Sequence, residues 1–179
     1  LLTGLLWLAG CTNVVVPPPA PVEPSPVILI DHGRHASLVL PGPDSGAVRY
    51  AYGDWNYYAL VKTGFIETSG AALWHTQAGL GRRELAEPPT AASVRRAVRV
   101  GIEELYELTV EANEVRRLRR RLDGLFRANL ETRVYNAAYD LEFVHHPRPY
   151  TAIYNSNRVV ALWLRALSCR VRGPLLFSK

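Results

Sequence analysis

Short runs of β-branched and aliphatic residues near the start of the chain predict β-strands. Residues 27–31 (Val-Ile-Leu-Ile-Asp) form the first run, and residues 37–40 (Ser-Leu-Val-Leu) form the second. The stretch between them is polar and contains a glycine, so we expect the two strands to be joined by a tight turn. The same kind of pattern predicts strands at residues 48–52, 94–100 and 150–154.

Two longer segments have the spacing of helices. Across residues 111–130, apolar side chains recur at steps of three and four, with arginines between them. Residues 158–167 are apolar on nearly every side, and such a helix is usually buried. It follows Asn155, Ser156 and Asn157, whose side chains are typical of helix starts. A short helical turn is predicted at residues 71–74.

These elements predict an α+β fold for a single domain, residues 27–179. We expect an antiparallel sheet built from segments near both ends of that range. The sheet should pack on the buried helix that starts at Ser156, and the helix at residues 111–130 should flank it.

The first residues of the chain have a different character. Residues 1–10 are nearly all apolar and end in Ala9-Gly10, and Cys11 follows. This run is too short to span a bilayer, which needs about 20 helical residues, and it matches the apolar end of a signal peptide. A buried amino-terminal helix is the alternative.

The segment Leu8-Ala9-Gly10-Cys11 resembles the lipobox of bacterial lipoproteins. In that family the cysteine receives a diacylglyceryl group and the chain is cut just before it. The resemblance implies that residues 1–11 are a signal remnant and that Cys11 attaches the protein to the lipid bilayer. It also implies an extracytoplasmic place in the bacterial cell envelope, on the periplasmic side.

Residues 12–26 contain six prolines. Proline fixes its own φ angle and lacks an N–H group, so this stretch favours extended polyproline II over sheet or helix. It predicts a spacer that holds the domain about 30–40 Å from the lipid.

The net charge of +5 comes almost wholly from arginine, because the only lysines are Lys62 and Lys179. A basic protein can bind nucleic acid or an anionic membrane. Acidic residues are interspersed throughout, and the sequence has neither a basic stripe nor a nucleic-acid-binding motif, so we expect a solvated surface and no nucleic-acid partner. If Cys11 carries lipid, Cys169 has no disulfide partner.

The start of the second helix is the first candidate for chemistry. Ser156 lies where the free N–H groups of the helix gather, and a serine there is either a helix cap or a nucleophile. The five histidines have spacings that fit no metal motif. We therefore predict neither a metal nor a cofactor.

Several short motifs occur together in a distinctive order: His32-Gly33-Arg34-His35-Ala36-Ser37-Leu38, Tyr52-Gly53-Asp54, and Tyr150 followed by Asn155-Ser156-Asn157 and Trp163. Residues 27–54 and 139–174, which carry them, resemble an uncharacterised family of bacterial envelope proteins. That family is distantly related, through circular permutation, to the papain-like NlpC-type cell-wall peptidases. The resemblance implies a permuted papain-like architecture.

The resemblance also assigns roles to residues. Ser156 stands where the family has its nucleophilic cysteine, His35 stands where it has its base, and Asp54 or Asn157 would orient the imidazole. Two positions depart from the family pattern: the nucleophile is serine, and Arg34 replaces a tryptophan. A hydroxyl is far less acidic than a thiol, so a helix dipole and an imidazole do not ionise it.

We therefore predict a membrane-anchored lipoprotein with a degenerate papain-like site, binding a cell-wall peptide, a glycan-peptide or an acyl ligand. An active hydrolase or acyltransferase, with Ser156 as nucleophile and His35 as base, is the alternative. A purely structural envelope lipoprotein, in which Ser156 only caps the helix, is the second alternative.

Overall fold

The structure is a computed structural model that describes residues 14–33, 35–60 and 75–173. The signal-like run, Cys11, Arg34 and the helical turn expected at residues 71–74 lie outside these ranges. What was predicted for those positions stays a prediction.

The first two predicted strands form the expected hairpin, β2 (Pro24–Asp31) and β3 (Ala36–Pro41). Gly33 lies in the turn with φ of +85°, a conformation that L side chains rarely adopt. The carboxylate of Asp31 accepts a hydrogen bond from the Gly33 N–H at 2.7 Å, which fixes the turn.

The hairpin belongs to a seven-stranded sheet in the order β6-β2-β3-β4-β5-β8-β7, and every neighbouring pair is antiparallel. The α+β class and the antiparallel sheet predicted from the sequence are thus confirmed. The other strands are β4 (Ala47–Asp54), β5 (Thr76–Leu85), β6 (Glu104–Glu111), β7 (Val134–Asn136) and β8 (Leu141–Tyr150).

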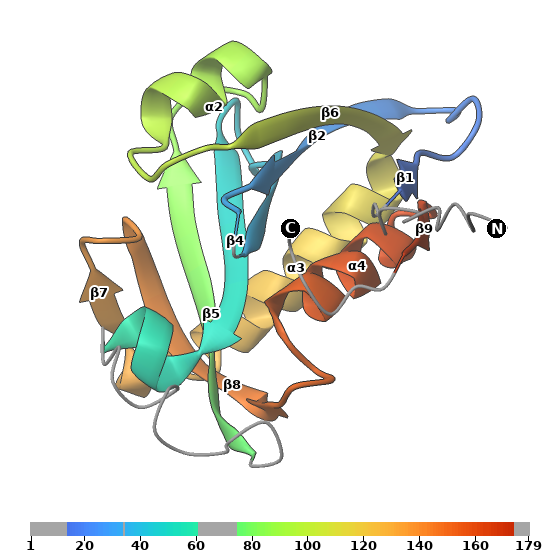
Figure 1. Cartoon of the computed structure of the whole chain (residues 1–179). Helices are drawn as coiled ribbons and strands as arrows, with labels where there is room; N and C mark the ends of the chain where they lie inside the picture. The colour runs from blue at the N-terminus through green and yellow to red at the C-terminus, as the bar shows by residue number, and fades with distance from the viewer. Residues whose placement is uncertain (1–13, 34, 61–74, 174–179) are drawn as a thin grey trace, which may run out of the picture.

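Helices α3 (Ala112–Arg127) and α4 (Ser156–Ala166) cover what we call the first face of the sheet (Figure 1). Their apolar sides pack against alternate residues of the central strands, because side chains of a strand point to opposite faces in turn. Both helices predicted from periodicity are confirmed. The core of this face includes Leu38, Leu40, Tyr50, Tyr52, Leu118, Leu122, Val160 and Trp163.

The opposite side, which we call the second face, is covered by shorter elements. Val94 of helix α2 (Ala91–Ala97) and Val98, the residue that caps its C-terminus, pack against Ile28, Ile30 and Val39. The single π-helical turn η1 (Trp55–Ala59) packs Trp55 and Tyr58 near Ala51 and Phe143. Because both faces are covered, all eight residues of β4 are buried.

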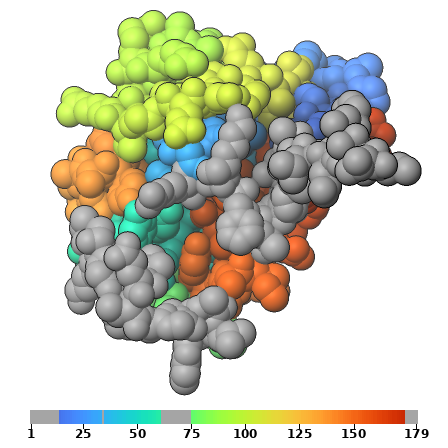
Figure 2. Space-filling model, in the orientation of Figure 1, coloured from blue at the N-terminus to red at the C-terminus, as the bar shows by residue number. Residues whose placement is uncertain are grey.

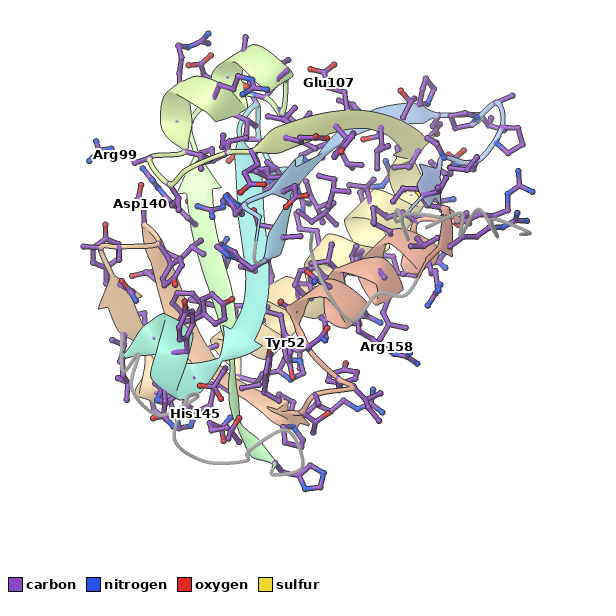
Figure 3. The ribbon with its side chains drawn as sticks, viewed as in Figure 1. Tyr52, Arg99, Glu107, Asp140, His145 and Arg158 are labelled. Atoms are coloured by element: carbon purple, nitrogen blue, oxygen red, sulfur yellow. The ribbon has the colours of Figure 1, made fainter. Side chains whose placement is uncertain are left out.

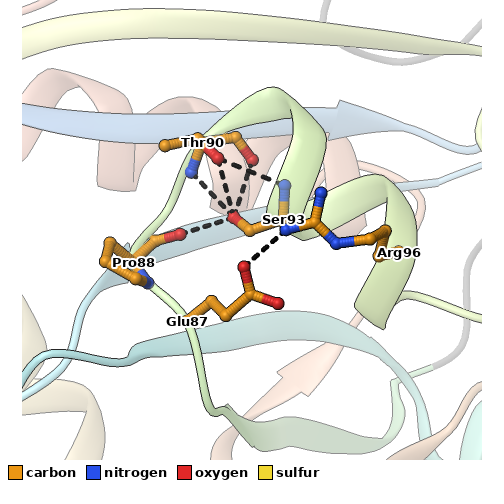
Figure 4. A network of polar contacts seen from close by, with 5 residues as sticks. All are labelled: Glu87, Pro88, Thr90, Ser93 and Arg96. Carbon is orange, nitrogen blue, oxygen red and sulfur yellow. Dashed lines mark hydrogen bonds and ion pairs between the residues drawn. The ribbon is translucent and has the colours of Figure 1, made fainter.

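The strand predicted at residues 94–100 is wrong, because α2 occupies most of that range. Thr90 and Ser93 form a capping box: the Thr90 Oγ1 accepts from the Ser93 N–H, and the Ser93 Oγ accepts from the Thr90 N–H, both at 3.1 Å. Figure 4 shows this network, with the Arg96–Glu87 ion pair beside it. Val94 and Val98 are four residues apart, so a helix buries both.

The strand predicted at residues 150–154 is also wrong. The strand β8 ends at Tyr150, and Thr151 and Tyr154 close a tight turn, in which the Thr151 N–H donates to the Tyr154 carbonyl. The sequence pattern predicted this strand after the prolines, because Pro147 and Pro149 disfavour a strand; β8 nevertheless includes both. Its pairing with β7 extends only to Phe143, so these prolines lie where one side of β8 has no ladder partner.

The spacer predicted for residues 12–26 needs correction. The strand β1 (Val14–Val16) pairs with β9 (Arg170–Arg172) in a two-stranded ribbon, and the side chains of Val15 and Val171 pack against the first-face core. Pro24 and Pro26 belong to β2, where β6 is their partner and β3 does not yet reach. The stretch is therefore divided between two sheets, and it cannot be one continuous 30–40 Å spacer.

Candidate functional site

The first turn of α4 is capped by a side chain, and the capping residue is Asn155 and not Ser156. The Asn155 Oδ1 accepts from the Arg158 N–H at 3.0 Å, and its Nδ2 donates to the Ala152 carbonyl at 3.1 Å. Ser156 is the first helical residue and only 3% of it is exposed.

Ser156 hydrogen-bonds to the side chain of Tyr150 through both its backbone and its side chain. Burial is the main cause that raises the pKa of the Tyr150 phenol, and the nearby charge of Asp54 adds to it. A phenol whose pKa lies above 10 is protonated at neutral pH, so it cannot remove the Ser156 proton. Tyr52 packs on Tyr150, with ring centroids 6.1 Å apart, and Figure 3 shows Tyr52 beside the start of α4.

Asp54 has a structural role that accounts for both of its oxygens. Its Oδ1 accepts from the Tyr57 N–H at 2.9 Å, which caps η1, and its Oδ2 accepts a short hydrogen bond from Thr76. Neither oxygen reaches a histidine, so Asp54 does not orient an imidazole in this structure.

His35 lies in an aromatic cluster on the second face. Its ring stacks on His32 with centroids 4.5 Å apart, and it meets the rings of Tyr58 and Tyr139 edge-on at 5.3 and 5.5 Å. Its Nε2 is buried and has no hydrogen-bond partner among the described residues. Burial, and then the neighbouring His32 and Arg49, lower the pKa of His35 to about 3. The ring is therefore neutral at physiological pH.

Among the residues that the structure describes, the most deeply buried charged side chain lies next to these histidines. Arg49 has no exposed surface, and its guanidinium donates to the Ser37 hydroxyl at 3.1 Å and to the Tyr139 carbonyl at 3.2 Å. Its Nη2 lies 3.2 Å from the His32 Nε2. Burial, together with the charge of Arg83, lowers the pKa of Arg49 to about 10, which leaves it protonated at neutral pH.

The protonation of His32 follows from its contacts. Its Nδ1 lies 2.6 Å from the Gly101 carbonyl and must donate to it, so its Nε2 carries the lone pair that faces Arg49. Burial, followed by the charge of Arg49, lowers the pKa of His32 to about 4. A neutral His32 is thus an acceptor for a buried cation.

The structure does not bring the predicted catalytic residues together. Within the described ranges, no hydrogen bond or ring contact joins His35 to Ser156, Asp54 or Asn157. Ser156 begins the helix that covers the first face, whereas His35 packs with residues of the second-face cluster. In the described residues, Asn155 thus caps α4 and His35 packs among aromatic rings, with no hydrogen bond between His35 and Ser156.

Asn157, the fourth predicted residue, faces a groove instead. This cavity of about 210 Å³ lies between α4, the outer strands β2 and β6, and the β1–β9 ribbon. Its polar lining residues are Asp31, Tyr106 and Asn157. Its apolar lining residues are Val15, Leu29, Ala36, Leu108, Val160, Ala161, Leu164 and Val171.

Sequence reasoning missed most of this groove and the whole Arg49 network. The groove residues come from six separate elements, and strand β6, which supplies Tyr106 and Leu108, was not predicted. The alternation of polar and apolar residues in residues 107–111 was the signal that could have revealed it.

Comparison of the chain with protein-family models, with curated proteins and with solved structures finds no match. Within residues 14–33, 35–60 and 75–173, no three His, Cys, Asp or Glu side chains are grouped to hold a metal ion. In the same ranges, no helix has the length and apolar character needed to cross a membrane.

Proposed function

We propose that the chain is a bacterial envelope lipoprotein, attached through acylated Cys11, whose α+β domain binds a ligand without converting it. The observation that carries the binding part is the groove beside α4. It combines apolar walls with a small polar group of Asp31, Tyr106 and Asn157, the usual composition of a ligand site.

The groove favours one kind of ligand among those expected from the sequence. Apolar side chains of α4 and β6 suit an acyl chain or an apolar peptide side chain. The Asp31 carboxylate suits a head group that donates hydrogen bonds, such as a hydroxyl or an amine, and disfavours an anionic one.

The absence of a nucleophile–base contact supports a binding role over hydrolysis. A serine nucleophile needs a base within about 3.2 Å, oriented by a third group. Here the hydroxyl of Ser156 is engaged with Tyr150, and the Nε2 of His35 has no partner among the described residues. The permuted papain-like architecture remains part of the proposal as a lineage and assigns no catalytic step.

Binding can be tested by NMR with n-octyl-β-D-glucoside below its micelle concentration, a probe with an apolar chain and a hydroxyl-bearing head. We expect saturable amide shifts at Leu108, Asn157 and Ala161. Ala161→Leu narrows the groove and should weaken binding at least tenfold. Ala166→Leu makes the same change at an exposed position of the same helix and should leave binding unchanged.

Shifts spread evenly over the surface, or equal binding by both leucine variants, would disprove the groove as a ligand site. An N-acetylmuramyl dipeptide titration in parallel distinguishes a cell-wall peptide from an acyl ligand. Lipid attachment is tested separately, by labelled palmitate incorporation in bacteria that express the chain behind a complete signal sequence. Cys11→Ala should abolish the label.

A further inference from the structure

The β1–β9 ribbon has two unlike sides. Val14 pairs directly with Arg172, and Val16 pairs with Arg170. Residues directly opposite each other in an antiparallel pair point to the same side, so these four side chains share one surface. Val15 and Val171, which alternate with them, face the core instead. We call the outer surface, made of Val14, Val16, Arg170 and Arg172, the ribbon patch.

The ribbon patch exposes apolar and cationic groups together. Val14 is 48% exposed and Val16 is 38% exposed, and both arginines are exposed. Among the residues that the structure describes, neither Arg170 nor Arg172 pairs with a carboxylate. The exposed Arg165 adds a third guanidinium, which donates to the Val171 carbonyl at 3.2 Å.

The acidic groups near the ribbon are engaged elsewhere. Glu23 pairs with Arg116 at 3.2 Å, and Glu114 accepts from the Ser168 hydroxyl at 2.7 Å. Neither contact involves an arginine of the ribbon patch, and exposed valines beside arginines suit the boundary between acyl chains and phosphate head groups.

The position of the patch in the chain gives the second argument. Cys11 precedes Val14 by three residues, a span of at most about 11 Å when fully extended. If Cys11 is acylated, the ribbon must lie next to the head groups. Figures 1 and 2 show β1 and β9 together at one end of the molecule, with α2 at the other side of the view.

We propose that the ribbon patch docks the domain on an anionic phospholipid surface. This orientation rests on the proposed lipid attachment for its cellular setting, but the contact itself does not need the lipid. Docking would place the groove, which Val15 and Val171 also line, close to the bilayer surface.

The test uses the full chain with Cys11→Ala, so that no acyl group contributes, and vesicles of phosphatidylcholine with or without phosphatidylglycerol. Arg170→Glu with Arg172→Glu should reduce the preference for phosphatidylglycerol vesicles at least about 25-fold, because each arginine near the surface contributes about 5-fold. The matched control, Arg95→Glu with Arg99→Glu, makes the same charge change on and just after α2. Figure 3 shows Arg99 at the edge far from the ribbon. The control should change that preference less than about threefold.

Comparison between the two vesicle types removes any charge-independent binding by residues 1–10. Val14→Ser with Val16→Ser should weaken binding to both vesicle types several-fold. Equal losses from the two arginine pairs would reduce the effect to net charge and overturn the proposal, as would full retention of binding by the ribbon variant. The vesicle assay uses protein without an acylated cysteine and with an unchanged groove. Its result therefore does not depend on the outcome of the palmitate labelling or of the NMR titration.

Discussion

Two arginines, Arg82 on the first face of the sheet and Arg49 on the second, have their charges compensated in different ways. On the first face, the Arg82 guanidinium lies 2.8 Å from the Asp123 carboxylate, which also accepts from the Tyr50 hydroxyl at 2.7 Å. On the second face, Arg83 pairs with the Asp140 carboxylate, but its cross-strand neighbour Arg49 is buried against a hydroxyl, a carbonyl and a neutral imidazole, and among the described residues no carboxylate forms an ion pair with it.

The difference matters because the two arrangements respond differently to a change in pH. On the first face, the Asp123 carboxylate compensates the Arg82 charge directly. The second-face network depends on His32 and His35 remaining neutral beside a buried cation, since a second positive charge there would be repelled. We therefore expect the second-face network to be sensitive to substitution and to acid.

The largest effect should come from removing Arg49. Arg49→Ala removes the donor to the Tyr139 carbonyl, leaves the His32 Nε2 with only the Ser37 hydroxyl, and opens a cavity, so we expect a loss of about 3 kcal/mol or more in the free energy of unfolding. Urea titration followed by circular dichroism measures it. Arg95→Ala, the same change at an exposed position, should cost less than about 0.5 kcal/mol.

Arg49→Lys sharpens this comparison. An ammonium group keeps the charge but cannot reach the three acceptors in the geometry of a guanidinium fork. Its stability should lie between those of the wild type and Arg49→Ala. A lysine variant as stable as the wild type would show that charge alone matters at this position, and the hydrogen-bond argument would fail.

The next effect is a dependence of stability on pH. The folded pKa values of His32 and His35, about 4 and about 3, lie below the ordinary value of 6.5. The unfolded chain therefore takes up protons first as the pH falls, so the stabilisation is present above about 6.5 and is lost towards pH 4. The slope should be at most about 1.4 kcal/mol per pH unit for each histidine.

Urea titrations between pH 7 and pH 4.5 test this slope. His35→Gln should flatten it, and the exposed His75→Gln should not. Some slope will remain in any case, because burial also lowers the pKa of His146. An unchanged slope in His35→Gln would mean that this imidazole is not the group that titrates.

Sequence patterns were sufficient for the regular elements and insufficient for the contacts between them. The hairpin around Gly33 and both helices of the first face have strong local signals, and all three are confirmed. Strand β4 was found because β-branched and aromatic residues surround Arg49, but no local pattern shows that this arginine is buried. Its burial depends on Ser37, Tyr139 and His32, which come from other parts of the chain.

The candidate site shows the same limit. The motifs around His35 and Ser156 occur in the order that the family resemblance requires, but order along the chain does not place two side chains on one face of a sheet. The alternation of side chains along a strand decides which face each one occupies. Ser37 pairs with Ala51 on the second face, and His35, two residues earlier, lies on that same side. The helix that Ser156 begins lies on the first face.

The smallest expected effect is that of His35 on the reactivity of a cysteine at position 156, and it tests the proposed papain-like lineage most directly. In a Cys11→Ser, Cys169→Ala background, Ser156→Cys should be alkylated by iodoacetamide more slowly than Ser45→Cys, because residue 45 is exposed and residue 156 is buried. Adding His35→Ala should change the rate at pH 7 less than twofold, as should His75→Ala. A papain-like pair would behave differently, since loss of the imidazole would raise the thiol pKa and slow alkylation about tenfold or more. That result would show that the two faces exchange contacts in solution, and it would return Ser156 and His35 to a common site.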